Sequence, residues 1–299
     1  NNVIDSIMVE GKEHSETKDL LNAIAKFYDE LYSSKNINNI EIDKYLDSIE
    51  LENILSNEEK ESIEGKISYK ECNDALKCLK LNKSSGLDRL PAEFYKKSWH
   101  KIKNIVVDAF NESFDDGVLI ESQRRAIITL FFKKGDAQLL SNYRPISVTC
   151  VDYKLLAFCL ANRLQKVIKG IVNTSQVAYI NDRFIGTNIR LTLDIFEYIN
   201  TENFCKAFDS LEWNFLFKVL EKFNFGISFI KWIKTLYSEP IACIKNNGYI
   251  TRDVQIQRSV RQGCPVSAIL FILCLEMSSE IRKKTKISQA SLCQKKIIL

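Results

Sequence analysis

The sequence predicts an α+β fold, in which helices and strands occur in separate runs and do not alternate regularly. Glycine and proline are scarce, with 10 and 4 among 299 residues, which favours long helices over an all-β sandwich. The order of the elements indicated along the chain is helices, strand, helices, hairpin and helix, which is unlike βαβ alternation. Hydrophobic residues make up 45% and charged residues 27%, and this ordinary balance excludes a disordered or collagen-like chain.

The N-terminal part of the chain is predicted to be helical. Leu20, Ile24, Phe27 and Leu31 form one apolar stripe at helical spacing. Residues 57–60 have the polar and acidic character of a helix start. We therefore expect helices before the first strand.

A loop and a long helix are predicted next. Residues 82–88 contain a Lys-Ser-Ser-Gly run that breaks the apolar pattern. Beyond it, Ile102, Ile105, Ala109 and Phe110 are expected on the buried side of a helix.

A buried strand and a second long helix follow. The apolar run 126–132 predicts a strand that ends in a turn carrying Lys133 and Lys134. An apolar stripe at every fourth position predicts a helix over residues 153–168, and its basic residues, including Arg163, are expected to lie off the core.

The last third of the chain predicts helices and one hairpin. The helices are expected over residues 188–199, 212–223 and 229–237. The pair Asn247-Gly248 lies between two apolar runs, 241–245 and 249–256, and accepts the positive φ angles of a type I′ turn. This is the clearest hairpin signal in the sequence.

The charge is unevenly distributed along the chain. Residues 1–60 carry 14 acidic and 6 basic side chains, whereas residues 121–190 carry 11 basic and 4 acidic ones. A positive stretch of this kind is what a polyanion-binding surface requires, because neutralised phosphates release counterions. A solvated helical face explains the same pattern about as well.

Metal-binding and membrane-spanning patterns are lacking in the sequence. Nine cysteines form no Cys-x-x-Cys pair and there are only two histidines, so we expect reduced thiols and no structural zinc site. The longest apolar run, residues 268–275, is far below the roughly 20 residues of a membrane span. The polar start is unlike a signal peptide, and we expect an intracellular protein.

Five polar or glycine-containing blocks occur in a fixed order. They are Lys83-Ser84-Ser85-Gly86-Leu87-Asp88, Phe131-Phe132-Lys133-Lys134-Gly135-Asp136, Asn142-Tyr143-Arg144-Pro145-Ile146-Ser147, Lys206-Ala207-Phe208-Asp209 and Arg261-Gln262-Gly263-Cys264-Pro265. Together they resemble the reverse transcriptases of LINE-type (non-LTR) retrotransposons. The resemblance covers residues 81–282, and weaker similarity extends to about Leu20.

The resemblance implies a right-hand polymerase that copies RNA into DNA with two divalent metal ions, Mg²⁺ in the family. It implies a helical N-terminal extension over residues 1–80, fingers with an incomplete palm over 81–282 and a divergent tail over 283–299, with the thumb absent. The implied partners are an RNA template, a DNA primer and deoxynucleoside triphosphates (dNTPs). No membrane partner is expected.

The resemblance also implies nucleotide-binding residues, which are Lys133, Lys134, Arg144, Phe208, Gln262 and Gly263. The basic side chains would meet the triphosphate, because the reaction joins two polyanions. The aromatic ring would lie under the deoxyribose, where a 2′-hydroxyl would collide. The Gln-Gly pair would line the sugar and the templating base, since glycine permits a close backbone approach.

The metal-binding residues depart from the family pattern. Asn203 stands where the family has a metal-binding Asp, and a neutral amide cannot replace a carboxylate on a hard dication. No Asp or Glu follows Glu280, so the family's later Asp-Asp pair is not found. Asp209 is interpreted as the N-cap of the helix that starts near Trp213, and Asp115-Asp116 as a helix end and turn.

These departures predict a degenerate domain that binds no metal and has no polymerase activity. An alternative of another class is a non-enzymatic nucleic-acid-binding remnant, whose affinity would fall steeply with salt. A third possibility is a reading frame that is disrupted after Arg282 and continues elsewhere.

Overall fold

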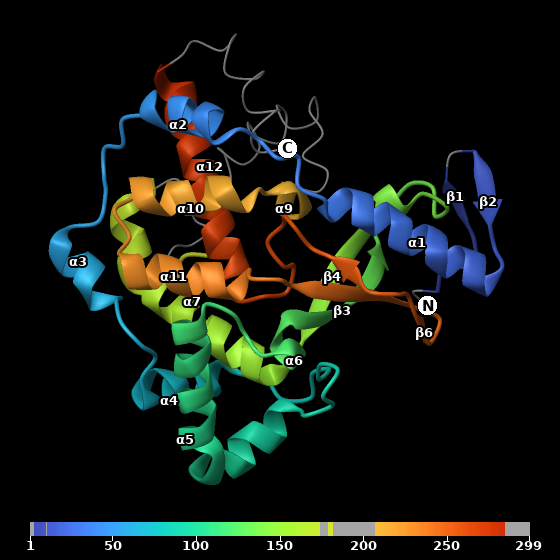
Figure 1. Cartoon of the computed structure of the whole chain (residues 1–299), viewed down its shortest axis with the longest axis horizontal. Helices are drawn as coiled ribbons and strands as arrows, with labels where there is room; N and C mark the ends of the chain where they lie inside the picture. The colour runs from blue at the N-terminus through green and yellow to red at the C-terminus, as the bar shows by residue number, and fades with distance from the viewer. Residues whose placement is uncertain (1–2, 10, 174–178, 182–206, 285–299) are drawn as a thin grey trace.

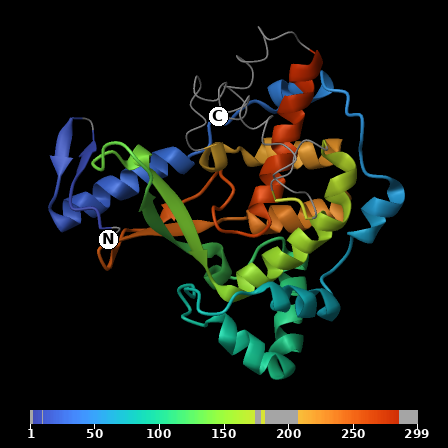
Figure 2. The same cartoon turned by 180° about the vertical axis from the view of Figure 1, so that it is seen from behind.

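A computed structural model of the chain describes residues 3–9, 11–173, 179–181 and 207–284 (Figures 1 and 2). Helices and strands occur together without βαβ alternation, which confirms the predicted α+β class. The predicted helix over residues 188–199 lies outside the described residues. Among the described helices, none combines the length and the hydrophobicity that a membrane span needs.

The chain forms a five-stranded mixed sheet from two separate parts of the sequence. Its strands are β3 (Arg125–Phe132), β4 (Tyr143–Thr149), β5 (Ile241–Asn246), β6 (Tyr249–Ile250) and β7 (Val254–Gln255). The order is β4-β3-β5-β6, and β7 also pairs with β5. Strand β3 runs parallel to β5 and antiparallel to β4. The strand predicted over residues 126–132 is therefore confirmed.

The predicted hairpin turn is confirmed between β5 and β6. Asn247 has φ +47° and Gly248 has φ +83°, as a type I′ turn requires. The second half of the hairpin is shorter than predicted, because β6 ends at Ile250 and β7 begins only at Val254.

The sequence pattern did not predict strand β4 around Arg144-Pro145. Tyr143–Thr149 pairs with β3 along its whole length, and Pro145 lies opposite Leu130. Because β4 is the outer strand on this side of the sheet, the backbone nitrogen of Pro145 can face away from β3, and its missing N–H breaks no hydrogen bond of the ladder. Arg144 is therefore held on a strand.

Helix α1 (Thr17–Tyr32) covers one face of the sheet. Ile24 and Tyr28 belong to one buried cluster with Ile128 and Ile244, which confirms the predicted helix. A small hairpin of β1 (Ile7–Val9) and β2 (Lys12–His14), which the sequence pattern did not predict, precedes α1.

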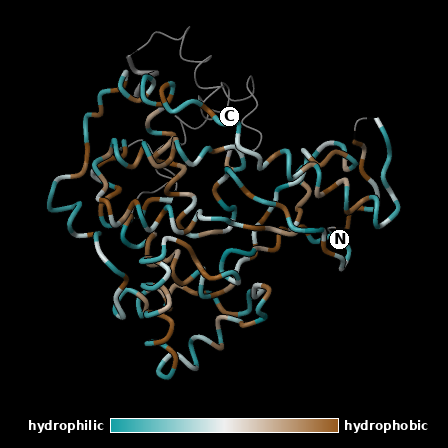
Figure 3. The backbone as a smooth tube through the Cα atoms, viewed as in Figure 1, coloured by the Kyte–Doolittle hydropathy of each residue, from teal (hydrophilic) through white to brown (hydrophobic). Residues whose placement is uncertain are grey.

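The remaining helices form a larger body beside the sheet. They are α2 (Asn39–Asp47), α3 (Asn57–Ser62), α4 (Tyr69–Cys78), α5 (Ala92–Asp116), α6 (Glu121–Arg124), α7 (Val151–Ile171), α9 (Ala207–Ser210), α10 (Trp213–Lys222), α11 (Ile227–Leu236) and α12 (Ser267–Lys284), with a 3₁₀ turn at Leu140–Asn142. Hydrophobic and hydrophilic residues alternate along most of them, as expected for helices that bury one face (Figure 3). The apolar stripe predicted for the helix over residues 153–168 is buried in α7.

Helix α5 differs in part from its prediction. Phe110 is buried, but Ile105 is 71% exposed because the buried stripe continues through Val107 and Phe114. The predicted end of the helix at Asp115-Asp116 is confirmed, since Gly117 closes α5 with φ +74°.

Arg163 of α7 was expected off the core, and that expectation is wrong. Its side chain is buried and forms an ion pair with Glu71 of α4. It also donates to the carbonyl oxygens of Ile63, Gly65 and Lys66, so all five N–H groups of the guanidinium are used. This residue links α7 to the α3–α4 connection and is not part of a basic surface.

Candidate nucleotide-binding site

The turn between β3 and β4 carries the two predicted lysines. Lys133 and Lys134 follow β3 and are exposed. Gly135 has φ +93°, which favours glycine, and the Lys133 N–H donates to the carbonyl of Asn142 at 2.9 Å. The turn therefore presents both ammonium groups to solvent at the end of the β3–β4 hairpin.

Arg144 lies on β4, near the same end of the hairpin. Its side chain is exposed and its partner residue across the strands is Phe131, whose ring is also exposed. Pro145 is buried and restricts the backbone beside it. The three predicted cationic residues therefore belong to one hairpin and face solvent.

Gln262 and Gly263 lie against the other end of β4. The Ser147 N–H donates to the Gln262 carbonyl at 2.8 Å. A Cβ atom on Gly263 would be 3.0 Å from the Ser147 carbonyl oxygen, and the φ of this glycine is +103°. Ser147 is three residues from Arg144, or about 10 Å along a strand. Strand β4 therefore contains Arg144 and also holds the Gln-Gly pair through the Ser147 hydrogen bond.

Phe208 lies on α9 and is half-buried. Its ring stacks on that of Phe271 of α12, with centroids 4.3 Å apart and an interplanar angle of 24°. The Val260 N–H donates to the Phe208 carbonyl at 2.8 Å, which joins α9 to the segment that carries Gln262. The structure therefore brings Phe208 and the Gln-Gly pair together. Phe271 had no signal of its own in the sequence, because it lies within the apolar run 268–275.

Asp209 was expected to cap the helix that begins near Trp213, and the structure contradicts this. Helix α10 has Glu212 at its N-cap position and no side-chain capping hydrogen bond. Asp209 is buried and accepts hydrogen bonds from Gln262 instead. Helix α9, which carries Asp209, contacts α1. Burial, and after it the negative charge of Asp209, raises the pKa values of Tyr28 and Tyr32 on α1.

Arg261 packs the same block against α7. Its guanidinium lies 4.7 Å from the centre of the Tyr153 ring and donates to the carbonyl of Arg124 at 2.6 Å. Burial is the main cause that raises the pKa of Tyr153, and Arg261 opposes the rise. Because Arg261 is itself buried, it anchors the Gln-Gly segment to the protein interior and is not a surface cation.

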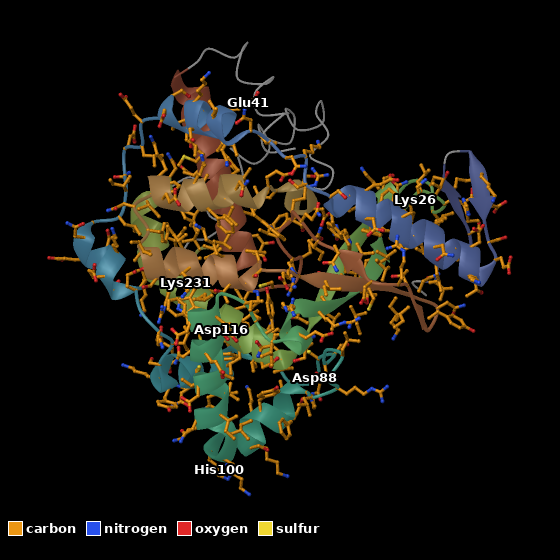
Figure 4. All side chains as sticks on the ribbon, viewed as in Figure 1. Lys26, Glu41, Asp88, His100, Asp116 and Lys231 are labelled. Atoms are coloured by element: carbon orange, nitrogen blue, oxygen red, sulfur yellow. The ribbon has the colours of Figure 1, made fainter. Side chains whose placement is uncertain are left out.

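One group of possible metal ligands lies among the described residues, and its chemistry does not suit Mg²⁺. Asn203 lies outside the described residues. Among the described residues, Asp88, Cys150 and Asp152 are the group whose ligand atoms come within 4.8 Å of one another (Asp88 is labelled in Figure 4). Mg²⁺ takes oxygen ligands, and a thiol does not suit it.

The members of this acidic group are also engaged within the protein. Asp152 accepts a hydrogen bond from Gln123 at 2.8 Å, and the Cys150 thiol donates to the carbonyl of Ser122 at 3.3 Å. Burial is the largest cause that raises the pKa of Asp152. We interpret the group as a polar contact between the loop over residues 82–88 and α7.

The chain is similar to a known family over more than half its length. Residues 132–297 match the family described as reverse transcriptase (RNA-dependent DNA polymerase). The chain is 31% identical over 259 residues, 84% of its length, to the transposon TX1 uncharacterized 149 kDa protein of Xenopus laevis. It is 30% identical over 160 residues, 50% of its length, to the Pol polyprotein of type-1 retrotransposable element R2 of Popillia japonica.

A further relative is the Pol polyprotein of type-2 retrotransposable element R2DM of Drosophila melanogaster, which is 28% identical over 168 residues, 54% of this chain. The chain spans 20%, 22% and 16% of the lengths of these three relatives. The family match begins at Phe132 and includes every residue of the candidate site.

Proposed function

This chain belongs to the reverse transcriptase family, as a domain of the LINE type, and from that premise we propose that Arg144, Lys133, Phe208 and Gln262 bind an incoming dNTP. The proposal is carried by one observation, the hydrogen bond that joins Gln262 to β4 three residues from Arg144. It links the basic hairpin to the segment beside Phe208. An RNA template and a DNA primer are the proposed polynucleotide partners.

The chemistry of each side chain suits this role. The Arg144 guanidinium and the ammonium groups of Lys133 and Lys134 are exposed, so a triphosphate can reach them. The Phe208 ring is held by Phe271 and offers a flat apolar surface to a sugar. Fingers and palm are the parts of the polymerase to which we assign these elements.

Metal binding is proposed to be incomplete in this chain. Asn203 supplies a neutral amide at the family's Asp position, and the Asp88–Cys150–Asp152 group is unsuited to Mg²⁺. We propose that residues 1–299 bind dNTPs and do not extend a primer.

Calorimetric titration of residues 1–299 with the magnesium complex of dTTP tests the binding proposal. We expect saturable binding that Arg144→Ala weakens about ten- to hundredfold, since a charge-assisted hydrogen bond contributes about 1.5–3 kcal/mol. Lys166→Ala is the matched control, because Lys166 is exposed on α7 and lies outside the candidate site. Absent binding, or equal effects of the two variants, would contradict the proposal.

A nucleic-acid-binding role without catalysis is the second candidate, favoured by the exposed cations of the β3–β4 hairpin. The number of basic residues in the stretch 121–190 overstates the positive charge available to a nucleic acid, because three of them already form ion pairs with carboxylates. These are Arg124, Arg125 and Arg163. Filter binding of single-stranded RNA at 50 and 200 mM salt tests this role, and a flat salt response would count against it.

A further inference from the structure

We propose that Asp209 is a positioning residue that orients the Gln262 amide in the nucleotide site, an inference that rests on the proposed function. Both oxygens of the Asp209 carboxylate accept from the Gln262 amide nitrogen, each at 3.0 Å. Asp209 is only 2% exposed, so water competes little for these contacts. A carboxylate is a stronger acceptor than a neutral oxygen, so the amide has one favoured orientation.

This contact determines what Gln262 can offer a ligand. A glutamine amide has a donor nitrogen and an acceptor oxygen, and the two exchange places when the amide flips. Because Asp209 holds the nitrogen, the oxygen Oε1 is left to accept a hydrogen bond from a bound molecule. Gln262 is thereby suited to a nucleotide hydroxyl, which can donate, and unsuited to a phosphate oxygen, which cannot.

The backbone around the contact is held by other hydrogen bonds. The Val260 N–H donates to the Phe208 carbonyl and the Ser259 N–H to the Leu211 carbonyl, both at 2.8 Å. The Gln262 carbonyl is held separately by β4. Loss of the Asp209 carboxylate should therefore release the Gln262 side chain and leave the segment 259–263 in place. This separates a positioning role from a purely structural one.

A double-mutant cycle on dTTP affinity tests the proposal with the full chain. The variants are Asp209→Asn, Gln262→Ala and the double variant, each titrated with magnesium-dTTP and melted in parallel. We expect Asp209→Asn to weaken binding about five- to tenfold in the wild-type background. In the Gln262→Ala background it should change affinity by less than about twofold, because the group it orients is gone.

The matched control is Asp116→Asn, which removes an exposed carboxylate at the end of α5 (labelled in Figure 4) and should leave dTTP affinity unchanged. Asp209→Ser is the second variant if Asp209→Asn does not fold, and the same cycle applies to it. Additive effects, or an unchanged affinity of Asp209→Asn while Gln262→Ala weakens binding, would overturn the positioning role and leave the proposed function intact. No dTTP binding by the wild-type chain would overturn both.

Discussion

Substitution of Arg163 by Met should strongly destabilise the domain. The guanidinium makes five hydrogen bonds, two to the Glu71 carboxylate and three to carbonyl oxygens of the α3–α4 connection. Met keeps much of the aliphatic volume but donates nothing. The carboxylate of Glu71, whose side chain is 23% exposed, and three carbonyls would then lose their partner.

The magnitude follows from breaking a buried ion pair on one side, which costs about 3–5 kcal/mol. Glu71 keeps its hydrogen bonds from the Ser68 N–H and hydroxyl, so we expect a value within that range and not above it. Arg163→Lys should cost about half as much, because an ammonium group has three donors in place of five.

Urea denaturation followed by circular dichroism measures this change in the free energy of unfolding. Lys166→Ala on the same helix is the control and should stay within about 0.5 kcal/mol of wild type, since Lys166 is exposed. A loss below about 1 kcal/mol for Arg163→Met would refute the reasoning. If the Arg163→Met protein were fully stable but bound RNA more weakly, the result would instead support a role for Arg163 in a basic RNA-binding surface.

Three further results are expected. Gly263→Ala should weaken dTTP binding and lower the free energy of unfolding by about 1–3 kcal/mol. The reason is that the φ of this residue is +103° and the new Cβ would lie 3.0 Å from the Ser147 carbonyl oxygen. An unchanged melting temperature would contradict this. Gly86→Ala should cost at least about 2 kcal/mol in urea denaturation, since its Cβ would fall 2.5 Å from the Cys150 backbone nitrogen. Burial raises the pKa of Glu71, but hydrogen bonds outweigh burial and leave the pKa below 4.5. The ionised Glu71 should therefore contribute fully to the free energy of unfolding above about pH 4.5, and this contribution should fade as pH falls further. Glu71→Gln should remove this pH-dependent part of the stability.

Local sequence patterns predicted the elements that are decided locally. The helical stripe of α7 and the Asn247-Gly248 turn depend on neighbours within a few residues, and both are confirmed. Strand β4 was missed because a proline in a short polar block gives no strand signal, although an outer strand tolerates proline. Ile105 was misplaced because the buried residues of α5 continue through Val107 and Phe110, and this stripe leaves Ile105 exposed.

Long-range partners account for the other differences. Arg163 is paired with a carboxylate 92 residues away, and Asp209 with an amide 53 residues away. Periodicity places a charged residue on a helix face but says nothing of a distant partner that would bury it. The blocks shared with the family predicted Arg144, Phe208 and the Gln-Gly pair as one group, and the structure places the last two side by side. Their role in nucleotide binding stays a prediction.

Primer extension tests the central claim most directly, namely that Asn203 leaves the nucleotide-binding residues without a complete metal site. Residues 1–299 are incubated with Mg²⁺, all four dNTPs and a labelled DNA primer annealed to an RNA template, at dNTP concentrations that saturate binding in calorimetry. The account predicts bound dTTP and no extended primer. Template-dependent extension by the wild-type chain would contradict it.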